Sequence, residues 1–351
     1  MFSLDEIKNY PVNWVDGMRV SAKDFEATDR AWNDAIRDTR ISILQGMQFG
    51  LLPALRDYRD EANYPKFHFD ASRNMLTLLE CRAITEGGYR IEITENLHHQ
   101  YKAPVALPFV RLDAREDLEI YITVHTQKKQ PVGEMTTDAP PRYVRVTPYY
   151  ELSVLAKSDG LALSETNHLK IAEYRWGNNI YSLDEHYIPP CMTMNAHRRL
   201  LERHTYMGGR LKGIHENSIK LINQYRGDAR NDVREAVIWL EKVITHISSG
   251  LWTYNDMLPG QSPKHTVVFV KNIAQVILST AEMHQSNLYV KDGMKTWAVL
   301  MKGIADPNFN DADLRTAFMR ITDAFNGFYK WLKSLEESLR QGRVIKVEKD
   351  I

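Results

Sequence analysis

Two stretches decide the fold: NDVREAVIWLEKVITHISSGLWTYNDM at residues 231–257, and LRTAFMRITDAFNGFYKWLKSLEESL at residues 314–339. In both, apolar residues alternate spacings of four and three without a miss, a period of about 3.5 residues. That period predicts two long helices whose apolar seams pack against neighbouring helices as in a coiled coil. The seam residues are Val233, Val237, Leu240, Ile244, Ile247, Leu251 and Tyr254 in the first stretch, and Leu314, Phe318, Ile321, Phe325, Phe328, Leu332, Leu335 and Leu339 in the second.

Seams of this kind predict long, rod-like helices. At a rise of about 1.5 Å per residue, the stretch from Asn231 to Met257 spans roughly 40 Å. A compact globule does not need a helix of that length, so we expect the seams to hold copies of the chain together in an oligomer. The residues expected to carry this oligomerisation are Val237, Leu240, Ile244, Ile247, Leu251, Phe325, Phe328, Leu332 and Leu335.

A Pro-Pro pair precedes the helical region. Residues 188–190, Ile-Pro-Pro, lack two backbone donors and hold the chain extended, so neither a central strand nor a helix can continue through them. Helix signals dominate afterwards. Asn195 is the expected cap of the first helix, the Ser-Pro pair at 262–263 begins a later one, and Asn310 is the expected cap of the last.

The region before the Pro-Pro pair has a different pattern. Short β-branched and aromatic stretches alternate with Gly, Pro, Asn and Asp, and helical crossovers between them are missing, which predicts an antiparallel β-sandwich. Gly87-Gly88 predicts a hairpin turn, and residues 130–141 a loop. The predicted strands are 66–69, 75–84, 89–94, 118–125, 142–150, 152–156, 169–176 and 180–183.

A helix is expected in front of the β-region, over residues 22–45. Ser21 and Asp24 have the spacing of a capping box with Asp in place of Glu. Phe25, Trp32, Ile36 and Ile43 then follow at helical spacing. The predicted fold class is α+β, divided into an extended arm at 1–21, an antiparallel β-sandwich domain with its leading helix at 22–190, a long helical bundle at 191–342 and a tail at 343–351.

The composition excludes several classes of function. With 351 residues, 43% of them apolar, the chain is long enough for two globular domains. Forty-five basic residues balance 45 acidic ones, so the sequence gives no electrostatic reason to expect a nucleic-acid partner. Two cysteines are too few for a disulfide framework. No secretory signal and no apolar run long enough to cross a bilayer is present, so we expect a cytoplasmic chain without direct membrane insertion.

Motifs of the common enzyme classes are missing. The sequence contains no Walker phosphate loop, no G-x-G-x-x-G, no H-E-x-x-H and no G-x-S-x-G. His197, His204 and His215 lie near one face of a predicted helix, yet two or three turns separate them, which is too far to share a metal. We therefore predict a structural assembly subunit, not an enzyme, with no catalytic residues, no cofactor and no metal site.

Two further interpretations stay open. Exposed aromatic residues in the β-region would favour a phage-type receptor-binding or glycan-binding adhesin, and an enzyme without a recognisable motif would show clustered, shifted titratable groups in a cleft. Trp14 also allows two interpretations, because an aromatic in an extended arm either plugs against the β-domain or anchors in a partner's pocket. The aromatics in question are Tyr143, Tyr149, Tyr150, Tyr174 and Trp176.

The arm resembles the opening of the TssK family, the baseplate subunit of type VI secretion systems. That family typically begins with Trp, an acidic residue, Gly-Met and then a His-Phe pair before its first helix. Asp24 stands here where the family usually has His. The matching residues are Trp14, Asp16, Gly17, Met18 and Phe25.

The Pro-Pro junction carries a second match. Residues 187–191, Tyr-Ile-Pro-Pro-Cys, followed by Asn195-Ala196 and Leu200, look like the family's junction between its shoulder and its neck. The order of regions is similar over most of the chain. Family members also carry a C-terminal head, and only about a dozen residues follow Leu339, so the resemblance implies a short form that lacks the head.

The resemblance implies a trimeric connector. Its β-sandwich would be a shoulder similar to that of phage receptor-binding proteins, and its helices would form the neck. It further implies wedge proteins of the TssF and TssG type as partners, and a position at the inner face of the cytoplasmic membrane, linked toward a membrane anchor. We expect Trp14, Gly17, Met18 and Phe25 to make the arm or partner contacts.

Overall fold

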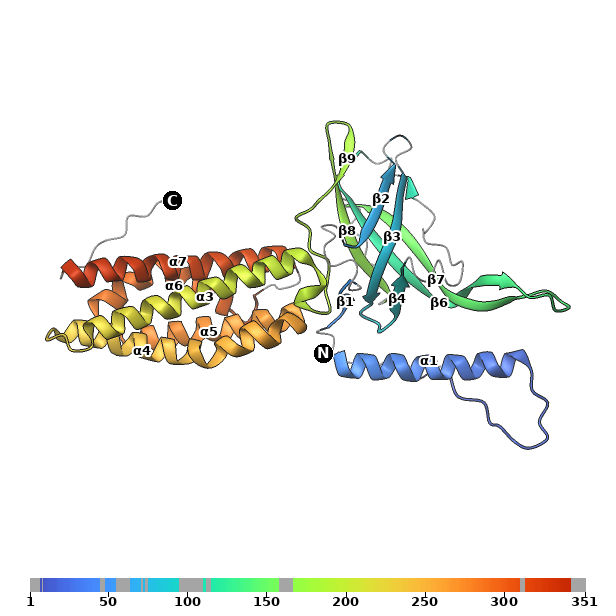
Figure 1. Ribbon diagram of the computed structural model, residues 1–351, viewed down its shortest axis with the longest axis horizontal. Helices are drawn as coiled ribbons and strands as arrows, with labels where there is room; N and C mark the ends of the chain where they lie inside the picture. The colour runs from blue at the N-terminus through green and yellow to red at the C-terminus, as the bar shows by residue number, and fades with distance from the viewer. Residues whose placement is uncertain are drawn as a thin grey trace. The chain divides into compact units, whose positions relative to one another are not determined.

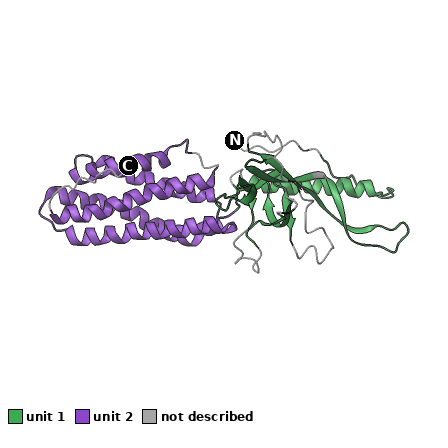
Figure 2. Ribbon diagram, turned by 90° about the horizontal axis from the view of Figure 1, so that it is seen from above, with its two compact units in different colours: residues 1–192 green, residues 193–351 purple. Residues whose placement is uncertain are grey.

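The structure is a computed structural model that describes residues 7, 9–44, 48–54, 64–70, 72, 75–94, 110–111, 115–157, 167–309 and 313–341. The chain divides into two compact units, unit 1 over Met1–Met192 and unit 2 over Thr193–Ile351 (Figures 1 and 2). Unit 1 contains the strands and one long helix, and unit 2 contains a bundle of helices. The predicted tail and the expected cap at Asn310 lie outside the described residues.

Unit 1 is built from two antiparallel sheets. In the first, β3 is central and pairs with every other strand of that sheet; in the second, the order is β7-β6-β8-β9. The first sheet consists of β1 (Gly50–Leu51), β2 (Lys66–Asp70), β3 (Met75–Ile84), β4 (Arg90–Ile93) and β5 (Val110–Arg111). The second consists of β6 (Leu118–Met135), β7 (Tyr143–Ala156), β8 (His168–Gly177) and β9 (Ile180–Leu183).

Aromatic side chains join the two sheets. The ring of Tyr174 on β8 lies 6.3 Å from that of Phe67 and 6.0 Å from that of Phe69, both on β2. Alternate residues of β3, such as Leu76 and Leu78, are fully buried, as expected when one face of a strand lines a core. The antiparallel β-domain predicted from the sequence is confirmed.

Strands β1 and β5 were not predicted, and the largest difference in strand boundaries lies at β6 and β7. Strand β6 continues to Met135, so the predicted loop at 130–141 is wrong over its first half, and the strands predicted at 142–150 and 152–156 form the single strand β7. Pro131 misled the prediction because it cannot donate to a ladder. Beyond Thr123, however, β6 pairs only with β7, so a missing donor on its other edge costs little.

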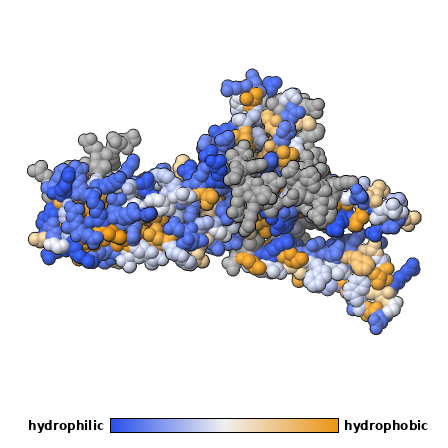
Figure 3. Space-filling model, viewed as in Figure 1, coloured by the Kyte–Doolittle hydropathy of each residue, from blue (hydrophilic) through white to orange (hydrophobic). Residues whose placement is uncertain are grey.

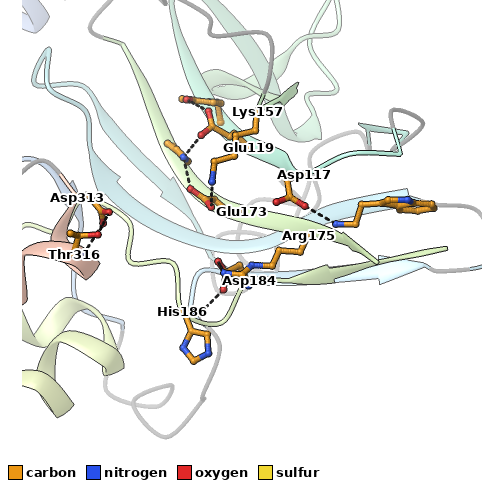
Figure 4. A network of polar contacts seen from close by, with 12 residues as sticks. Asp117, Glu119, Lys157, Glu173, Arg175, Asp184, His186, Asp313 and Thr316 are labelled. Atoms are coloured by element: carbon orange, nitrogen blue, oxygen red, sulfur yellow. Dashed lines mark hydrogen bonds and ion pairs between the residues drawn. The ribbon is translucent and has the colours of Figure 1, made fainter. Parts of the chain in front are cut away.

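Charged side chains hold the second sheet together on its polar face (Figure 4). Lys170 forms ion pairs with Glu119 on β6 and with Glu173, and Lys157 also reaches Glu173, at 3.3 Å. Lys170, Glu119 and Glu173 are only partly exposed, so their attraction is less screened than at a free surface. At the end of β9, Asp184 accepts from Arg175 at 2.7 Å and from the backbone N–H of His186.

The Pro-Pro junction is fixed within unit 1. The N–H of Leu51 donates to the carbonyl oxygen of Pro190 at 2.8 Å, and the N–H of Met192 donates to that of Leu51 at 2.9 Å. Gly50 permits this approach, because its φ is +114° and a Cβ there would lie 2.0 Å from the oxygen of Pro190. The extended segment thus lies beside β1 and pairs with it in parallel, through Leu51 and Cys191.

Unit 2 is a bundle of long helices around an aromatic core. α3 packs on α4 and α7, and α6 packs on α5 and α7. Trp239, Trp297, Phe328 and Trp331 meet at ring separations between 5.1 and 6.3 Å. The helices are α3 (Arg198–Tyr225), α4 (Asn231–Trp252), α5 (Pro263–Met283), α6 (Leu288–Ala305) and α7 (Leu314–Gln341).

Two features of the bundle differ from the prediction. α3 begins at Arg198, so Asn195 is not its cap; Asn195 lies in a short 3₁₀ turn, where its side-chain oxygen accepts from the Thr193 hydroxyl. A break between α5 and α6 was not predicted. Asn287 caps α6 there, accepting from two backbone N–H groups of the first turn at 3.1 Å each.

Candidate interaction surface

Helix α1 (Ala22–Leu44) begins at the predicted capping box. The carboxylate of Asp24 accepts from the backbone N–H of Ser21 at 2.8 Å and from its hydroxyl at 2.7 Å. Both bonds favour the ionised carboxylate, so the hydrogen bonds from Ser21 lower the pKa of Asp24. The start of α1 is therefore set by local sequence.

The apolar residues of α1 are exposed. Phe25 is 60% exposed, Trp32 65%, Ile36 45% and Ile43 72%, while Arg37 is the only residue of α1 that is buried among those whose side chains are described. A surface helix normally turns its apolar stripe to the core. Here the stripe faces outward, and apolar atoms gather at the surface over α1 and the arm in the space-filling view (Figure 3).

Polar contacts hold α1 against the β3–β4 hairpin. Arg37 donates to the Tyr89 hydroxyl at 3.4 Å, and Arg40 donates to the carbonyl oxygen of Gly88 at 3.1 Å. Asp38 of α1 itself pairs with Arg37 at 2.7 Å. Gly88 has a φ of +77°, and a Cβ there would lie 3.1 Å from Ile41. The predicted turn at Gly87-Gly88 is confirmed. Helix α1 packs against this turn.

The arm brings two predicted contact residues together. The rings of Trp14 and Phe25 lie 5.9 Å apart, and Trp14 is 46% exposed. Between them the chain turns at Gly17, whose φ is +80°, and the N–H of Met18 donates to the carbonyl oxygen of Val15 at 3.2 Å. Met18 is half-buried. Trp14 thus extends the apolar stripe of α1.

Comparison with known proteins identifies the fold. No protein-family model and no curated protein matches the sequence. Solved structures do match: a crystal structure of TssK has a TM-score of 0.56 at 13% identity, over 97% of this chain and 70% of that one. A chain of the type VI secretion baseplate complex has a TM-score of 0.57 at 14% identity, over 93% and 99%. The chain has the TssK fold.

A further TssK-like match comes from a TssK-TssF-TssG baseplate subcomplex solved by cryo-electron microscopy. It has a TM-score of 0.52 at 12% identity, over 93% of this chain and 100% of the matched chain. The likeness spans both units, so the resemblance expected from the arm and the Pro-Pro junction is confirmed at the level of the fold.

The seam residues occupy a different place in this TssK-like fold from the one expected for an oligomer contact. Most of them are buried among the helices of their own chain, where they form the core of the bundle, and their predicted role in oligomerisation stays a prediction. Ile244 and Leu251 are half-buried. The buried residues, all at most 3% exposed, are Val237, Leu240, Ile247, Phe325, Phe328, Leu332 and Leu335.

Groups suited to chemistry are dispersed. In the described part of the chain, no three His, Cys, Asp or Glu side chains gather where they could hold a metal ion. Burial raises the pKa of the thiols of Cys81 and Cys191, which keeps them protonated and unreactive at neutral pH. Within the same ranges, no helix combines the length and the apolar character needed to cross a membrane.

The aromatic residues that would favour a glycan-binding adhesin do not form a platform. Tyr143 is 47% exposed and Tyr174 only 3%. Tyr149, Tyr150 and Trp176 are half-buried, and the Tyr150 hydroxyl accepts from the backbone N–H of Glu92 in the other sheet. These side chains mainly serve the packing of unit 1.

Proposed function

We propose that this chain is a structural subunit of a type VI secretion baseplate and that it acts by binding other proteins, not by catalysis. The observation that carries the proposal is the apolar stripe of α1, exposed on a TssK fold. Covering apolar surface contributes about 25 cal/mol per Å², so a protein partner that buries this stripe gains binding free energy.

The proposed partners are wedge proteins of the TssF and TssG type. The solved structures that share the fold include a baseplate complex and a TssK-TssF-TssG subcomplex. We extend that assembly to this chain and assign the contact to unit 1, with Trp14, Gly17, Met18 and Phe25 as predicted contacts. A cytoplasmic position at the inner face of the membrane, linked toward a membrane anchor, stays a prediction.

We assign the predicted trimer to the part of the α1 stripe beyond Phe25 and not to the seams of unit 2. Trp32, Ile36 and Ile43 are spaced by four and seven residues, which keeps them on one seam with a period of about 3.5. Because each copy presents the same seam, α1 suits association with copies of itself around a symmetry axis.

Co-purification tests the proposal. The tagged chain is co-expressed with the TssF-type and TssG-type proteins of its own organism, as wild type and as the Trp14→Ala/Phe25→Ala variant. We expect the wild type to retain both proteins and the variant to lose them. The Val299→Ala variant is the control, since Val299 is 73% exposed on α6 of unit 2. Recovery of the wild type without either protein would contradict the proposal.

A further inference from the structure

A cavity of about 380 Å³ lies in unit 1 between α1, the β3–β4 hairpin and the β6–β7 pair. Its apolar lining includes Ile36, Val124 and Val146, and its cationic lining includes Arg37, Arg40 and Lys128. An occupant of this cavity would therefore meet both aliphatic carbon and cationic nitrogen.

Most cations around the cavity already have carboxylate partners. Arg37 pairs with Asp34 and Asp38. Arg90 pairs with Glu92 at 2.5 Å. Lys129 pairs with Asp29 at 3.6 Å, and the His125 ring contacts the Glu151 carboxylate at 2.5 Å. The acidic groups nearest the cavity are thus engaged.

Arg40 and Lys128 differ from these. In the described ranges, neither side chain has a carboxylate within ion-pair distance. Arg40 donates to the carbonyl oxygen of Gly88, and the Lys128 ammonium lies 5.7 Å from the centre of the Tyr149 ring. Burial, together with the charge of Arg90, lowers the pKa of Arg40. An added negative charge would relieve this repulsion.

We propose that this cavity binds an acidic side chain carried on an aliphatic segment of a protein partner, with Arg40 and Lys128 as the groups that recognise the carboxylate. The inference rests on the proposed role of unit 1 in binding protein, and it adds the chemistry of the bound segment. Arg40 offers a planar fork that matches a carboxylate, and Lys128 adds a point charge. Val124 and Val146 then pack against the aliphatic part.

A nucleic acid is the less suitable occupant. Single-stranded nucleic acids need a charged groove that follows several phosphates, with exposed rings for base stacking. Here two cations without a carboxylate partner line one open cavity, and the whole chain has a formal charge of zero. One carboxylate beside apolar carbon matches that charge and those walls.

A displayed library of random heptapeptides tests the inference. The library is first depleted on the immobilised Arg40→Gln/Lys128→Gln variant of the full chain and then selected on the wild type. We expect the recovered peptides to be enriched in Asp and Glu beside aliphatic residues, relative to the unselected library. The best peptide, made synthetically, should bind each single variant about tenfold more weakly than the wild type, because each loses a charge-assisted bond.

The controls separate recognition from loss of charge or fold. Lys212→Gln/Lys330→Gln removes two exposed cations from unit 2 and should bind the peptide as the wild type does. Lys128→Gln alone keeps the contact of Arg40 with Gly88, so its fold should be intact by circular dichroism. Selection without acidic enrichment, equal binding by the Arg40→Gln/Lys128→Gln variant, or displacement of the peptide by inorganic phosphate or single-stranded DNA would overturn the inference.

The selection contains no TssF-type or TssG-type protein. Acidic peptides recovered here, together with failed co-purification, would leave the cavity assigned and the baseplate role rejected. Successful co-purification without recovery of acidic peptides would keep the baseplate role and reject the cavity as a carboxylate site.

Discussion

Gly293 allows α6 to lie close against α7. A Cβ at Gly293 would fall 2.2 Å from two indole atoms of Trp331, which is itself 5% exposed. The Trp331 ring cannot move away from an added Cβ, because it packs against the rings of Trp239, Trp297 and Phe328. The aromatic core of unit 2 thus depends on one missing methyl group.

We expect Gly293→Ala to lower the free energy of unfolding by about 3 kcal/mol, as overpacking does in a dense core. Gly209 provides the matched control. It lies in α3 with nothing within 4 Å of its added Cβ, so Gly209→Ala should raise the free energy of unfolding by about 0.5–1 kcal/mol through helix propensity. Urea unfolding measures both. Equal shifts in the two variants would refute the close packing.

His197 makes unit 2 sensitive to acid. Burial lowers its pKa to about 4 from the usual 6.5, and its Nδ1 has no hydrogen-bond partner among the described residues. The unfolded chain therefore binds the proton more readily than the folded chain. The resulting penalty is absent above about pH 7, grows as the pH falls through 6.5, and reaches roughly 3 kcal/mol near pH 4.

We expect His197→Gln to remove that penalty. Between pH 7 and pH 4.5 the free energy of unfolding of the wild type should fall further than that of the variant. Chemical denaturation at each pH measures the difference, and carboxylates that titrate in the same range cancel because both proteins contain them. Parallel pH profiles would show that His197 is not desolvated in the fold.

Helices α4 and α7 show how far the sequence determines an element. All eight predicted seam residues of α7 are buried, whereas Ile244 and Leu251 of α4 are half-buried and Val243 is buried instead. The two exceptions are local, because Ile247 and Tyr254 lie further along the same seam and are buried. The period predicted the helices, but it could not tell a partner in the same chain from one in another copy.

Leu332→Asp and Ile244→Asp test this assignment. Leu332 is 1% exposed, so Leu332→Asp should lower the free energy of unfolding by about 3–5 kcal/mol, as an uncompensated buried charge does. Ile244→Asp should cost about 1 kcal/mol, since water already reaches that side chain. Thermal unfolding at two protein concentrations completes the test. A loss for Leu332→Asp that disappears at high concentration would restore the seam to an interface between copies.

At the scale of the whole molecule, the sequence predicts the order of the regions along the chain better than it predicts which side chains are exposed. Phe25, Trp32 and Ile43 have the same helical spacing whether the stripe faces a core or a partner, so periodicity could not show that α1 leaves them open. The cavity was missed for a related reason. Arg40 and Lys128 lie far apart in sequence. They line the same cavity only because α1 packs on the β3–β4 hairpin at Gly88. The exposed face of α1 is thus a property of the folded unit.

The mass of the purified chain under native conditions tests the central claim, that the exposed stripe of α1 is a protein interface. Native mass spectrometry at micromolar concentration should find three copies for the wild type and one for Trp32→Glu/Ile43→Glu. Both residues are exposed on the single chain, so the variant should still fold, which circular dichroism checks. A single copy for the wild type, or three copies for the folded variant, would contradict the account.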